Sequence, residues 1–475
     1  MPVIRFTIDD PSLQKVFDAA VEKSRPNLKD FQGRRVLVEG GGYEKIWLET
    51  QPMGGEMYAG FDMECARNNI LFFLDYQRAD GRMPGSIYCP ETGPIEPQFN
   101  KFQGFCFPWH ALNLYYLMGE DRDYLDALAS GLEKLDRYLW TYRDSDGDGC
   151  LESFCVYDTG EDNAVRFGNA PVYWTENDPP RGFDTVPMAS MDVMSWSYAC
   201  RDTLAQICRI RGEQNAWAQK ADAVREAMKQ RLWHEDRGAC YDRAPDGHVL
   251  PQLVHNNLRC MYWGSFSPDM AKRFVSEHLL NPREFWTPMP LPSVSVSDPD
   301  FRNAPENNWS GQCEGLTYQR AILALERYGF DAIVPRLGRA LFSAVGDHGM
   351  HFVQQYDPFT GAPSLVSQLT HQVITRPDEP VQDAYGPTIL ATLEYFAHMW
   401  GVDLEMGQAV FRAQPGPCFR YTREHLGHVY ELEGLETEAV ARLDGYELKR
   451  FARGHCLRTD MKGNILGLSS ISGSC

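Results

Sequence analysis

Pairs of amphipathic segments joined by short links constrain this chain more than any other feature of its sequence. Apolar residues recur every three or four positions, which predicts helices, over residues 11–24, 56–78, 103–118, 122–142, 189–211, 214–233, 268–280, 312–328, 330–346 and 383–400. Three pairs follow one another closely: 103–118 with 122–142, 189–211 with 214–233, and 312–328 with 330–346. Such short links are typical of antiparallel helical hairpins.

Two long segments, 143–188 and 281–311, lie between the hairpins and are rich in Pro, Asp, Asn and Trp. Loops of this length without a regular pattern are uncommon in compact domains and are usually functional or disordered. Aromatic residues such as Trp174, Trp286 and Trp309 argue against disorder. We therefore expect these loops to line a site.

Roughly ten to twelve helices in hairpins, with long loops on one rim, predict an all-α fold, an (α/α)6 toroid of six hairpins, over residues 1–404. A helical solenoid is the alternative, but its links would be short and regular. From residue 405 to 475, short alternating runs predict a small β-rich C-terminal appendage, with strands near 418–421, 428–432 and 439–443. Residues 34–50 suggest one more hairpin, turning at Gly40–Gly42.

Composition excludes several classes of partner. The chain has 46 Lys+Arg against 65 Asp+Glu, a formal charge of −19, whereas nucleic acids and anionic membranes attract positive surfaces. No apolar stretch approaches the roughly 18 residues of a membrane span, and the first residues lack the pattern of a secretory signal. The thirteen cysteines are odd in number and form no CxxC pair, which favours reduced thiols in the cytoplasm. We expect a small-molecule partner and no cofactor, and the oligomeric state stays open.

The run Asp144-Ser-Asp146-Gly-Asp148-Gly149 matches the opening of a calcium-binding EF-hand loop. Position twelve of that loop supplies a bidentate Glu, but Cys155 stands there. We therefore interpret the run as a turn that ends a helix rather than as a metal site.

Two segments carry carboxylates in a pattern that suits sugar chemistry. In and directly before Thr159–Phe167, three acids (Asp158, Glu161 and Asp162) lie close to Arg166, and crowded carboxylates can raise one pKa to that of a general acid. A solvated acidic loop is the alternative. At the start of a helix, Asp62 can bind sugar hydroxyls or simply cap the helix.

Two further segments are candidates for a sugar-binding wall. Residues 306–315 offer the amide of Asn308, the indole of Trp309 and the carboxylate of Glu314 at a helix mouth, which suits stacking and directed hydrogen bonds. The run Gln354-Gln-Tyr-Asp357-Pro-Phe-Thr-Gly361 is typical of a turn.

The order of these motifs is more specific than any one of them. An aromatic-plus-Asp helix start, QxxDGxxP, SDGDG, TGxDNxxRF, NxWxG before a helix and YDPxTG follow one another between about residues 56 and 400. This order resembles the six-hairpin inverting glycosidases of the trehalase, mannosyl-oligosaccharide glucosidase and mannosylglycerate hydrolase clan. TGEDNAVRF and QYDPFTG are the most specific pieces.

The resemblance implies a role for several positions. Asp162 corresponds to the acid that protonates the leaving group, with Arg166 beside it, and Asp62 to the residue that grips sugar hydroxyls. Trp309 corresponds to a wall of the subsite, although Ser310 replaces the family's Arg. Trp174, Asn308 and Gln354 are expected to bind the sugar as well. If the alignment is displaced, Asp178 is the acid instead.

One departure affects the mechanism, because Gln354 stands where the clan has its general base, a Glu. An amide cannot accept a proton from water, and an inverting hydrolase needs two carboxyls roughly 6.5–9.5 Å apart. Glu314 is our first choice for the replacement, ahead of Asp357. We predict a glycoside hydrolase acting with inversion on a small α-linked gluco- or manno-configured glycoside. An inverting phosphorylase, whose phosphate needs no base, and a catalytically silent sugar-binding protein are the alternatives.

Overall fold

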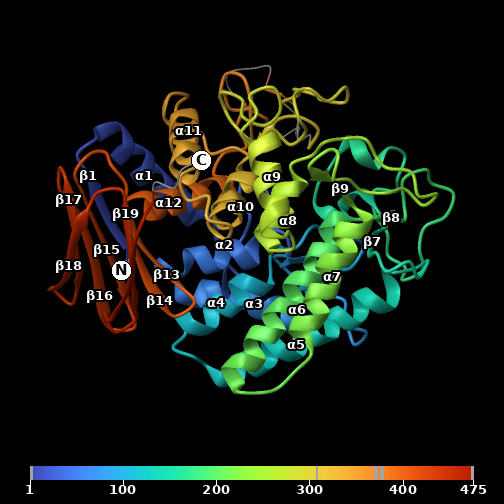
Figure 1. Cartoon of the computed structure of the whole chain (residues 1–475), viewed down its shortest axis with the longest axis horizontal. Coiled ribbons are helices and arrows are strands. Elements are labelled where there is room, and N and C mark those ends of the chain that lie inside the picture. Colours follow the sequence, from blue (N-terminus) through green and yellow to red (C-terminus); the bar gives the residue numbers. More distant parts are fainter. Residues whose placement is uncertain (1–3, 306–308, 368–372, 375–378, 472–475) are drawn as a thin grey trace.

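The computed structural model describes residues 4–305, 309–367, 373–374 and 379–471. Its α-helices, labelled in Figure 1, form an inner and an outer layer according to their packing contacts. The inner layer contains α2 (Gln51–Met57), α4 (Pro108–Leu117), α6 (Met191–Arg211), α8 (Asn256–Trp263), α10 (Gly315–Glu326) and α12 (Gly386–Trp400). The outer layer contains α1 (Pro11–Ser24), α3 (Met63–Asp75), α5 (Arg122–Tyr142), α7 (Trp217–Arg231), α9 (Pro268–Phe274) and α11 (Val334–Gly346).

The inner helices close into a ring. Each packs against the next in the order α2, α4, α6, α8, α10 and α12, and α12 packs against α2 again. The N-terminal helix α1 packs against α12 and completes the sixth hairpin. The three hairpins expected from short links are α4–α5, α6–α7 and α10–α11, and the structure confirms them. The helical part of the chain is therefore an (α/α)6 toroid.

Most helices of both layers were visible in the sequence, and a short buried one was not. Outer helices such as α5 alternate buried and exposed positions with helical spacing, because one face packs on the ring and the other meets water. Every residue of the inner helix α8 is buried, so none of its faces meets water, and its eight residues give only a short pattern. The amphipathic pattern therefore missed α8, and it also missed the start of α2.

The predicted helix over 56–78 is two helices. Helix α2 ends at Met57, a 3₁₀ turn covers Tyr58–Gly60, and α3 starts at Met63. Asp62 is the N-cap of α3, and its Oδ1 accepts a hydrogen bond from the backbone N–H of Cys65 at 3.1 Å. The chain therefore turns from the inner to the outer layer at this point, with a carboxylate satisfying a free N–H of the new helix.

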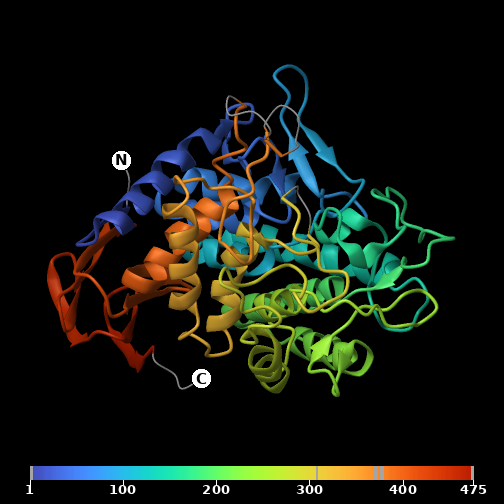
Figure 2. The same cartoon turned by 90° about the horizontal axis from the view of Figure 1, so that it is seen from above.

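Beside the toroid lie two antiparallel sheets, seen as the red strands at one end of the molecule in Figure 2. One has the order β1-β15-β16-β17-β18 and the other the order β13-β14-β19-β20. Their bounds are β1 (Ile4–Ile8), β13 (Gly401–Glu405), β14 (Gln408–Ala413), β15 (Phe419–His425), β16 (His428–Gly434), β17 (Glu438–Leu443), β18 (Tyr446–Ala452), β19 (His455–Asp460) and β20 (Ile465–Ser470). The three strands expected near 418–443 are β15, β16 and β17.

This β-unit differs from the predicted appendage in two ways. It begins at Gly401, directly after α12, rather than at residue 405. It also recruits the N-terminal strand β1, in which Phe6 pairs with Tyr421 of β15. Alternation predicts a strand but not its partner, so a pairing across more than 400 residues was not visible in the sequence. An all-α description holds only for the toroid.

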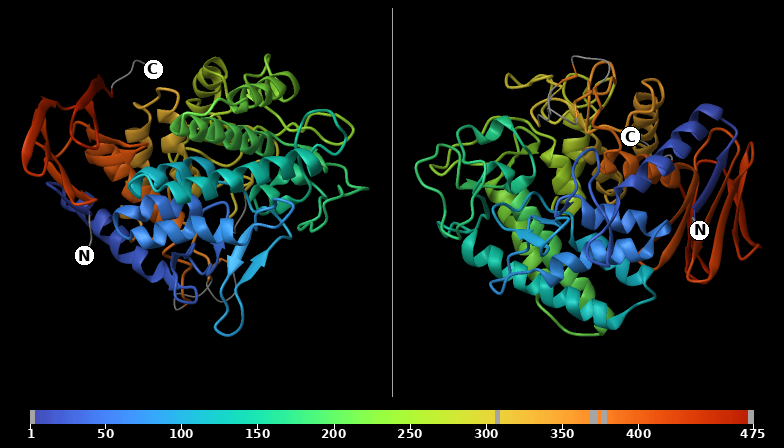
Figure 3. Two further views of the ribbon diagram at one scale, coloured as in Figure 1. Left: turned by 90° about the horizontal axis from the view of Figure 1, so that it is seen from below. Right: turned by 180° about the vertical axis from the view of Figure 1, so that it is seen from behind.

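The long loops gather at one rim of the toroid. The six connections that lead from an outer to an inner helix are long, whereas the links from inner to outer helices are short. The long loops contain short strand pairs, namely β2 (Leu28–Asp30) with β3 (Arg35–Leu37), β4 (Ile46–Trp47) with β5 (Ser86–Tyr88), β5 with β6 (Glu96–Gln98), β7 (Glu152–Ser153) with β8 (Met188–Ala189), β9 (Trp233–His234) with β10 (Ala239–Cys240), and β11 (Cys313–Glu314) with β12 (Gln355–Tyr356). Figure 3 shows these loops from two sides.

The segment 34–50 forms its expected turn but not a hairpin of its own. Gly40 and Tyr43 exchange backbone hydrogen bonds of 3.1 and 3.0 Å, and both flanking strands pair elsewhere. Among the helices described, none is long and apolar enough to cross a membrane. No disulfide joins any of the twelve cysteines in the described ranges.

Candidate active site

A polar cavity of about 160 Å³ opens at the rim that carries the long loops, beyond the N-terminal ends of the inner helices. Five of the six long loops contribute to its wall. The lining residues are Glu39, Tyr43, Trp47, Glu49, Lys101, Gln103, Tyr157, Gly160, Asp162, Tyr173, Trp309, Gln354 and Tyr385. A second cavity of about 130 Å³ shares Tyr43, Gln354 and Tyr385 with it. The two together form a small, carboxylate-lined hollow over the centre of the ring.

Asp162 and Trp309 meet in this hollow although 147 positions separate them in the chain. The backbone N–H of Trp309 donates to the carbonyl of Asp162 at 3.4 Å. The hydroxyl of Ser310 donates to the carbonyl of Asn163 at 2.9 Å and accepts from the N–H of Val165 at 3.0 Å. Ser310 therefore joins the loop that carries Asp162 to the loop that carries Trp309. The sequence-based expectation that Asp162 and Trp309 lie together agrees with this geometry.

Two further carboxyls, Glu39 and Glu49, line the same cavity. Glu39 is 8% exposed and accepts a hydrogen bond from the Tyr385 hydroxyl at 3.2 Å. Burial, and then the neighbouring charges of Glu49 and Asp162, raise the pKa of Glu39 well above its usual value. Burial also raises the pKa of Glu49 to about 7, although Arg320 at 3.1 Å and Arg259 at 3.6 Å oppose the shift.

The Glu49 carboxylate depends on a glycine opposite it. Gly160 ends a 3₁₀ turn with φ 76°, a left-handed conformation that residues with a side chain adopt only at a cost. A Cβ at this position would also overlap the carboxylate of Glu49. Gly160 therefore allows the Thr159–Asp162 loop to approach Glu49 closely.

The floor beneath Asp162 is a buried network of charges. Arg166 is only 3% exposed and forms ion pairs with Glu161, Asp192 and Asp242, the pair with Asp192 at 2.9 Å. Arg166 holds the pKa of Glu161 well below its usual value, whereas burial outweighs it at Asp242, whose pKa rises to about 6. Arg166 does not line the cavity, so the expectation that it binds the sugar is corrected. It holds the loop that presents Asp162.

A histidine connects this network to the aromatic wall. His255 lies 3.0 Å from Glu161 Oε1 through Nε2 and 2.9 Å from the Thr317 hydroxyl through Nδ1. Burial lowers the pKa of His255 to about 4, so the ring is neutral, donates to Glu161 and accepts from Thr317. Its ring centroid is 5.6 Å from that of Trp309. The indole is thus packed against a rigid hydrogen-bonded support.

A lysine lies in an aromatic cage on the other side of the cavity. Lys101 is 5% exposed. Its ammonium group lies 5.0, 5.2 and 4.8 Å from the ring centroids of Trp47, Tyr157 and Tyr173. Burial lowers the pKa of Lys101 to about 8, and the charge of Asp162 opposes that shift. The site therefore offers one cation to an anionic group of a ligand.

The chain resembles known proteins by sequence and by fold. Residues 57–372 match the model of the mannosylglycerate hydrolase MGH1-like glycoside hydrolase domain. The chain belongs to this family. It is a glycoside hydrolase.

Solved structures of low identity share the fold. The GH63 mannosylglycerate hydrolase of Thermus thermophilus, in complex with Tris and D-glycerate, superimposes with a TM-score of 0.62 at 17% identity, covering 80% of this chain and 100% of that one. The neutral trehalase Nth1 of Saccharomyces cerevisiae gives 0.55 at 14% identity, with 76% and 74% covered. A structure described as a sialidase gives 0.69 at 14% identity, with 94% and 40% covered. No curated protein sequence matches the chain.

Glu314 lies behind the wall of the glycoside hydrolase's cavity rather than in it. It is fully buried on β11, opposite Gln355 of β12, whose side-chain amide donates to its Oε1 at 2.8 Å. Burial raises the pKa of Glu314 well above its usual value. Gln354, the residue at the expected base position, does line the cavity, and the Tyr43 hydroxyl donates to its Oε1 at 3.3 Å. The structure therefore does not bring Glu314 to the cavity surface.

Three other expected residues lie outside the cavity. Asp62 caps α3 and pairs with Arg35 at 2.6 Å, so the capping interpretation holds and the sugar-binding one is corrected. Trp174 donates its indole N–H to the carbonyl of Asp178 at 2.8 Å, and the neighbouring Tyr173 lines the cavity in its place. Asp178 is exposed and does not line the cavity as an alternative acid. Asn308 lies outside the described residues.

The two turn motifs are turns. Asp144 Oδ1 accepts from the N–H of Gly149 at 3.1 Å, and Asp148 Oδ1 accepts from that of Cys150 at 2.8 Å. Asp357 accepts from the backbone N–H groups of Phe359 and Thr360, at 2.8 and 2.9 Å. Asp357 therefore organises its own turn and does not line the cavity.

Four of the lining residues that sequence reasoning missed come from one loop. Glu39, Tyr43, Trp47 and Glu49 all belong to the segment 34–50, which we interpreted only as a hairpin. The signal available was the combination of a triple-glycine turn with acids and aromatic residues on both sides, directly before a helix. Sugar sites combine carboxylates and aromatic faces in this way.

Proposed function

We propose that this glycoside hydrolase cleaves a small, α-linked gluco- or manno-configured glycoside with inversion, and that Asp162 is its general acid. The observation that carries the proposal is the meeting of Asp162, Glu39 and Trp309 at the surface of one small cavity. Carboxyls can exchange protons with the glycosidic oxygen and with water, and the indole offers an apolar face to a sugar ring. The limited volume suits a glycoside of one or two rings rather than a polymer.

We assign the base to Glu39 in place of Glu314. Glu39 reaches the cavity, whereas Glu314 is fully buried behind it. A carboxylate with a raised pKa is also a stronger base once it is ionised. In this scheme Glu39 takes a proton from a water that attacks the anomeric carbon, while Asp162 gives its proton to the oxygen of the departing group. The two carboxyls end the cycle with their protons exchanged, and solvent restores them.

We propose that Glu49, rather than Asp62, binds the hydroxyl groups of the sugar. Glu49 lines the cavity and is fixed by Arg320 and Arg259, so its oxygens are directed without free rotation. Lys101 suits an anionic leaving group, and the related structure from Thermus thermophilus holds D-glycerate, a carboxylate. A glycoside of a small hydroxy acid is therefore the substrate we would test first.

An inverting phosphorylase is the second candidate. Gln354 at the expected base position removes one carboxylate, and Lys101 supplies a cation for phosphate. Phosphate is already anionic and needs no base, so this pair of residues suits it.

The buried thiols, which act as small apolar side chains in the core, support the cytoplasm as the compartment.

The test is a substrate panel of α-glucosides and α-mannosides, both neutral and with a carboxylate in the leaving group, with and without phosphate. Proton NMR of the first product identifies the anomer released. We expect phosphate-independent hydrolysis with inversion in the wild type and a loss of at least about 100-fold in kcat for Asp162→Asn and Glu39→Gln. Glu314→Gln and Asp178→Asn are matched controls and keep most of the activity.

Four outcomes contradict the proposal. Retention of anomeric configuration refutes inversion. Full activity in Asp162→Asn or in Glu39→Gln refutes the assignment of that residue, and strict dependence on phosphate selects the phosphorylase. Binding of sugars without turnover of any member of the panel supports the silent alternative.

Since the pKa of Glu39 is raised, its base form is lost as the pH falls through that raised value. We therefore expect the acidic limb of the kcat/KM profile to lie above the ordinary Glu pKa of about 4.3. The variant Glu39→Asp keeps a carboxylate on a shorter side chain. We expect its kcat/KM to be lower and its pH profile to keep the acidic limb.

A further inference from the structure

A third cavity, separate from the two at the candidate active site, lies at the other end of the inner helices, where the toroid meets the C-terminal sheets. Its volume is about 300 Å³, and it shares no lining residue with the cavity of Asp162. Its wall includes the C-terminal ends of α10 and α12 and the strand β13. The ionisable side chains that matter here are Glu326, Glu394, His398, Asp403 and Glu405. Nothing in the proposed reaction uses them.

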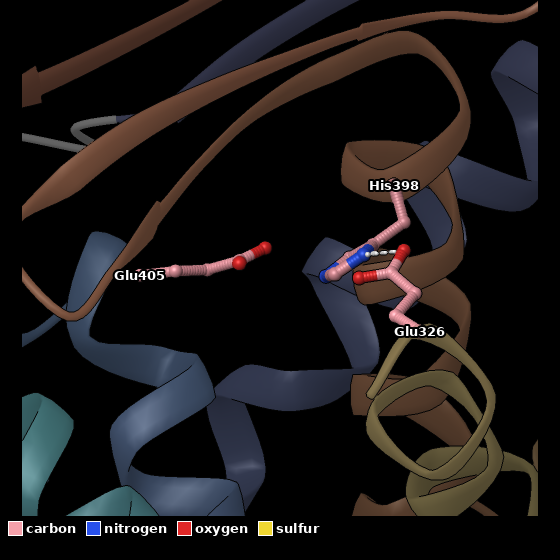
Figure 4. Close-up of side chains that lie close together, drawn as sticks. All are labelled: Glu326, His398 and Glu405. Atoms are coloured by element: carbon pink, nitrogen blue, oxygen red, sulfur yellow. Dashed lines mark hydrogen bonds and ion pairs between the residues drawn. The ribbon is translucent and has the colours of Figure 1, made fainter. Parts of the chain in front are cut away.

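His398 is held like a metal-binding histidine. Its Nδ1 lies 2.8 Å from Glu326 Oε1, so a carboxylate fixes the orientation of the ring. Its Nε2 lies 3.5 Å from Glu394 Oε2 and 3.5 Å from Asp403 Oδ2. In Figure 4, Glu326 lies on one side of the imidazole and Glu405, from β13, approaches from the other.

These spacings suit an ion between the atoms better than direct hydrogen bonds. Charge-assisted N–H···O bonds measure about 2.7–2.9 Å, shorter than the contacts of Nε2 with Glu394 and Asp403. Ligand atoms about 2.0–2.1 Å from a tetrahedral metal lie about 3.3 Å from one another, close to the observed separations.

His110 provides an independent observation in the same cavity. It is 1% exposed, and its Nδ1 lies 2.8 Å from Glu56 Oε2. Its Nε2 is buried and has no hydrogen-bond partner among the described residues. A buried polar atom without a partner costs stability unless something else satisfies it. The cavity thus holds two imidazoles that are each oriented by a glutamate.

Helix dipoles at this end of the cavity favour a cation, and two of the carboxylates are already paired with arginines. Helix α10 ends at Glu326 and His398 lies in the last turn of α12, where helix dipoles stabilise positive charge. Arg423 pairs with Asp403 at 3.0 Å and Arg412 with Glu326 at 2.6 Å. Among the ion pairs of the described residues, Glu394 has no partner but His398.

We propose that Glu394, His398 Nε2 and Asp403 bind a divalent transition-metal ion. Glu326 is a positioning residue for the imidazole, and Glu405, which groups with Glu326 and His398 rather than with Glu394 and Asp403, pairs with Arg412. One nitrogen and several carboxylate oxygens favour ions such as Zn²⁺ or Mn²⁺ over Ca²⁺, which prefers oxygen ligands alone. Because Glu394 and His398 belong to α12 and Asp403 to β13, the ion would join the toroid to the β-unit.

The experiment measures metal binding by the full-length protein. The protein is stripped with EDTA, and binding of Zn²⁺ and Mn²⁺ is followed by equilibrium dialysis with elemental analysis. The visible spectrum of a Co²⁺ complex distinguishes nitrogen and oxygen ligands from thiolates. We expect one ion of each metal per chain with no thiolate signal, and a rise in Tm when the metal returns.

Matched variants locate the ion. His398→Gln abolishes the binding and the rise in Tm, and Glu394→Gln, which keeps the side-chain volume, provides the same test if His398→Gln does not fold. Glu326→Gln weakens the affinity by about 10–100-fold, as expected for a residue that orients a ligand. Asp146→Asn removes a carboxylate from the exposed acidic turn and leaves the stoichiometry unchanged.

A wild-type protein that binds no metal at micromolar free concentration overturns the proposal, and so does binding that His398→Gln and Glu394→Gln do not affect. Neither result depends on glycosidase activity. The failure of the metal site is therefore distinguishable from the failure of the proposed reaction.

Discussion

Replacing Arg166 with Met is the most direct test of the charge network beneath the site. Met has a flexible apolar side chain and leaves Glu161, Asp192 and Asp242 buried without the guanidinium that pairs with all three. Breaking a buried ion pair by removing one partner costs about 3–5 kcal/mol. The structure allows a more specific calculation, because the stranded carboxylates can bind protons.

The calculation uses Glu161, whose pKa is held low by Arg166 in the wild type. Above the unfolded pKa this group stabilises the wild-type fold, and that stabilisation is lost as the pH falls. Without Arg166, the cation that remains beside Glu161 is Arg259, at 3.9 Å and beyond hydrogen-bonding distance, so we expect burial to raise the pKa above the unfolded value. The folded variant then takes up a proton and loses stability as the pH rises. Protonating a carboxyl of unfolded pKa about 4.3 costs about 3.7 kcal/mol at pH 7 but only about 1 kcal/mol at pH 5.

We therefore expect the difference in stability between wild type and Arg166→Met to widen by about 2–3 kcal/mol from pH 5 to pH 7 for each carboxyl that must be protonated. Urea unfolding followed by tryptophan fluorescence at both pH values measures it. Arg450→Met is the control, because this exposed residue also has two carboxylate partners but sits on the surface, and it should leave stability unchanged at both values. A variant as stable as the wild type at pH 7, or a deficit that grows as the pH falls, would refute the reasoning.

Two further predictions concern the walls of the site, and a third concerns Asp62, which lies outside it. Gly160→Ala lowers kcat/KM and reduces the free energy of unfolding. Left-handed backbone strain alone costs about 1–2 kcal/mol, and we expect a larger loss because the new Cβ meets Glu49. Gly147→Ala, whose Cβ meets nothing within 4 Å at a similar φ of 74°, measures the strain alone, and equal losses would contradict the contact. Lys101→Met raises KM at least about tenfold for glycosides of hydroxy acids but not for neutral glycosides. In the wild type the KM for glycosides of hydroxy acids also rises above a pH of about 8, because Lys101 loses its proton there. Equal effects on both substrate classes would show that Lys101 does not contact the leaving group. Asp62→Ala reduces stability by about 0.5–2 kcal/mol in urea unfolding with kcat/KM unchanged, and a loss of activity in the folded variant would return Asp62 to the site.

Local patterns predicted the parts of the fold that have a polar side. Helix α5 and its neighbours show helical spacing because one face meets water, and the links after α4, α6 and α10 are too short for anything but a hairpin. Inner helix α8 is buried on all sides, so its position follows only from the closed ring. Strand β1 looks like any exposed-edge strand until β15 is placed beside it.

The candidate site divides in the same manner. Asp162 and Trp309 were identifiable because each lies in a motif with several specific neighbours. Arg166 belongs to such a motif too, but whether a charged side chain faces a ligand or three buried acids depends on residues far away in the chain. Glu39 and Glu49 were missed because an acid beside a glycine turn is ordinary surface sequence until five loops converge around it.

Residue order and spacing predicted that this chain forms helical hairpins and ends in strands, and the resemblance to a glycosidase clan pointed to an acid and an indole. Only the tertiary structure decided which carboxyls share a cavity, because the ring brings together loops that lie as far apart as Glu39 and Tyr385. It also decided which ionisable groups are desolvated, and desolvation is what separates a structural ion pair from a group able to transfer a proton.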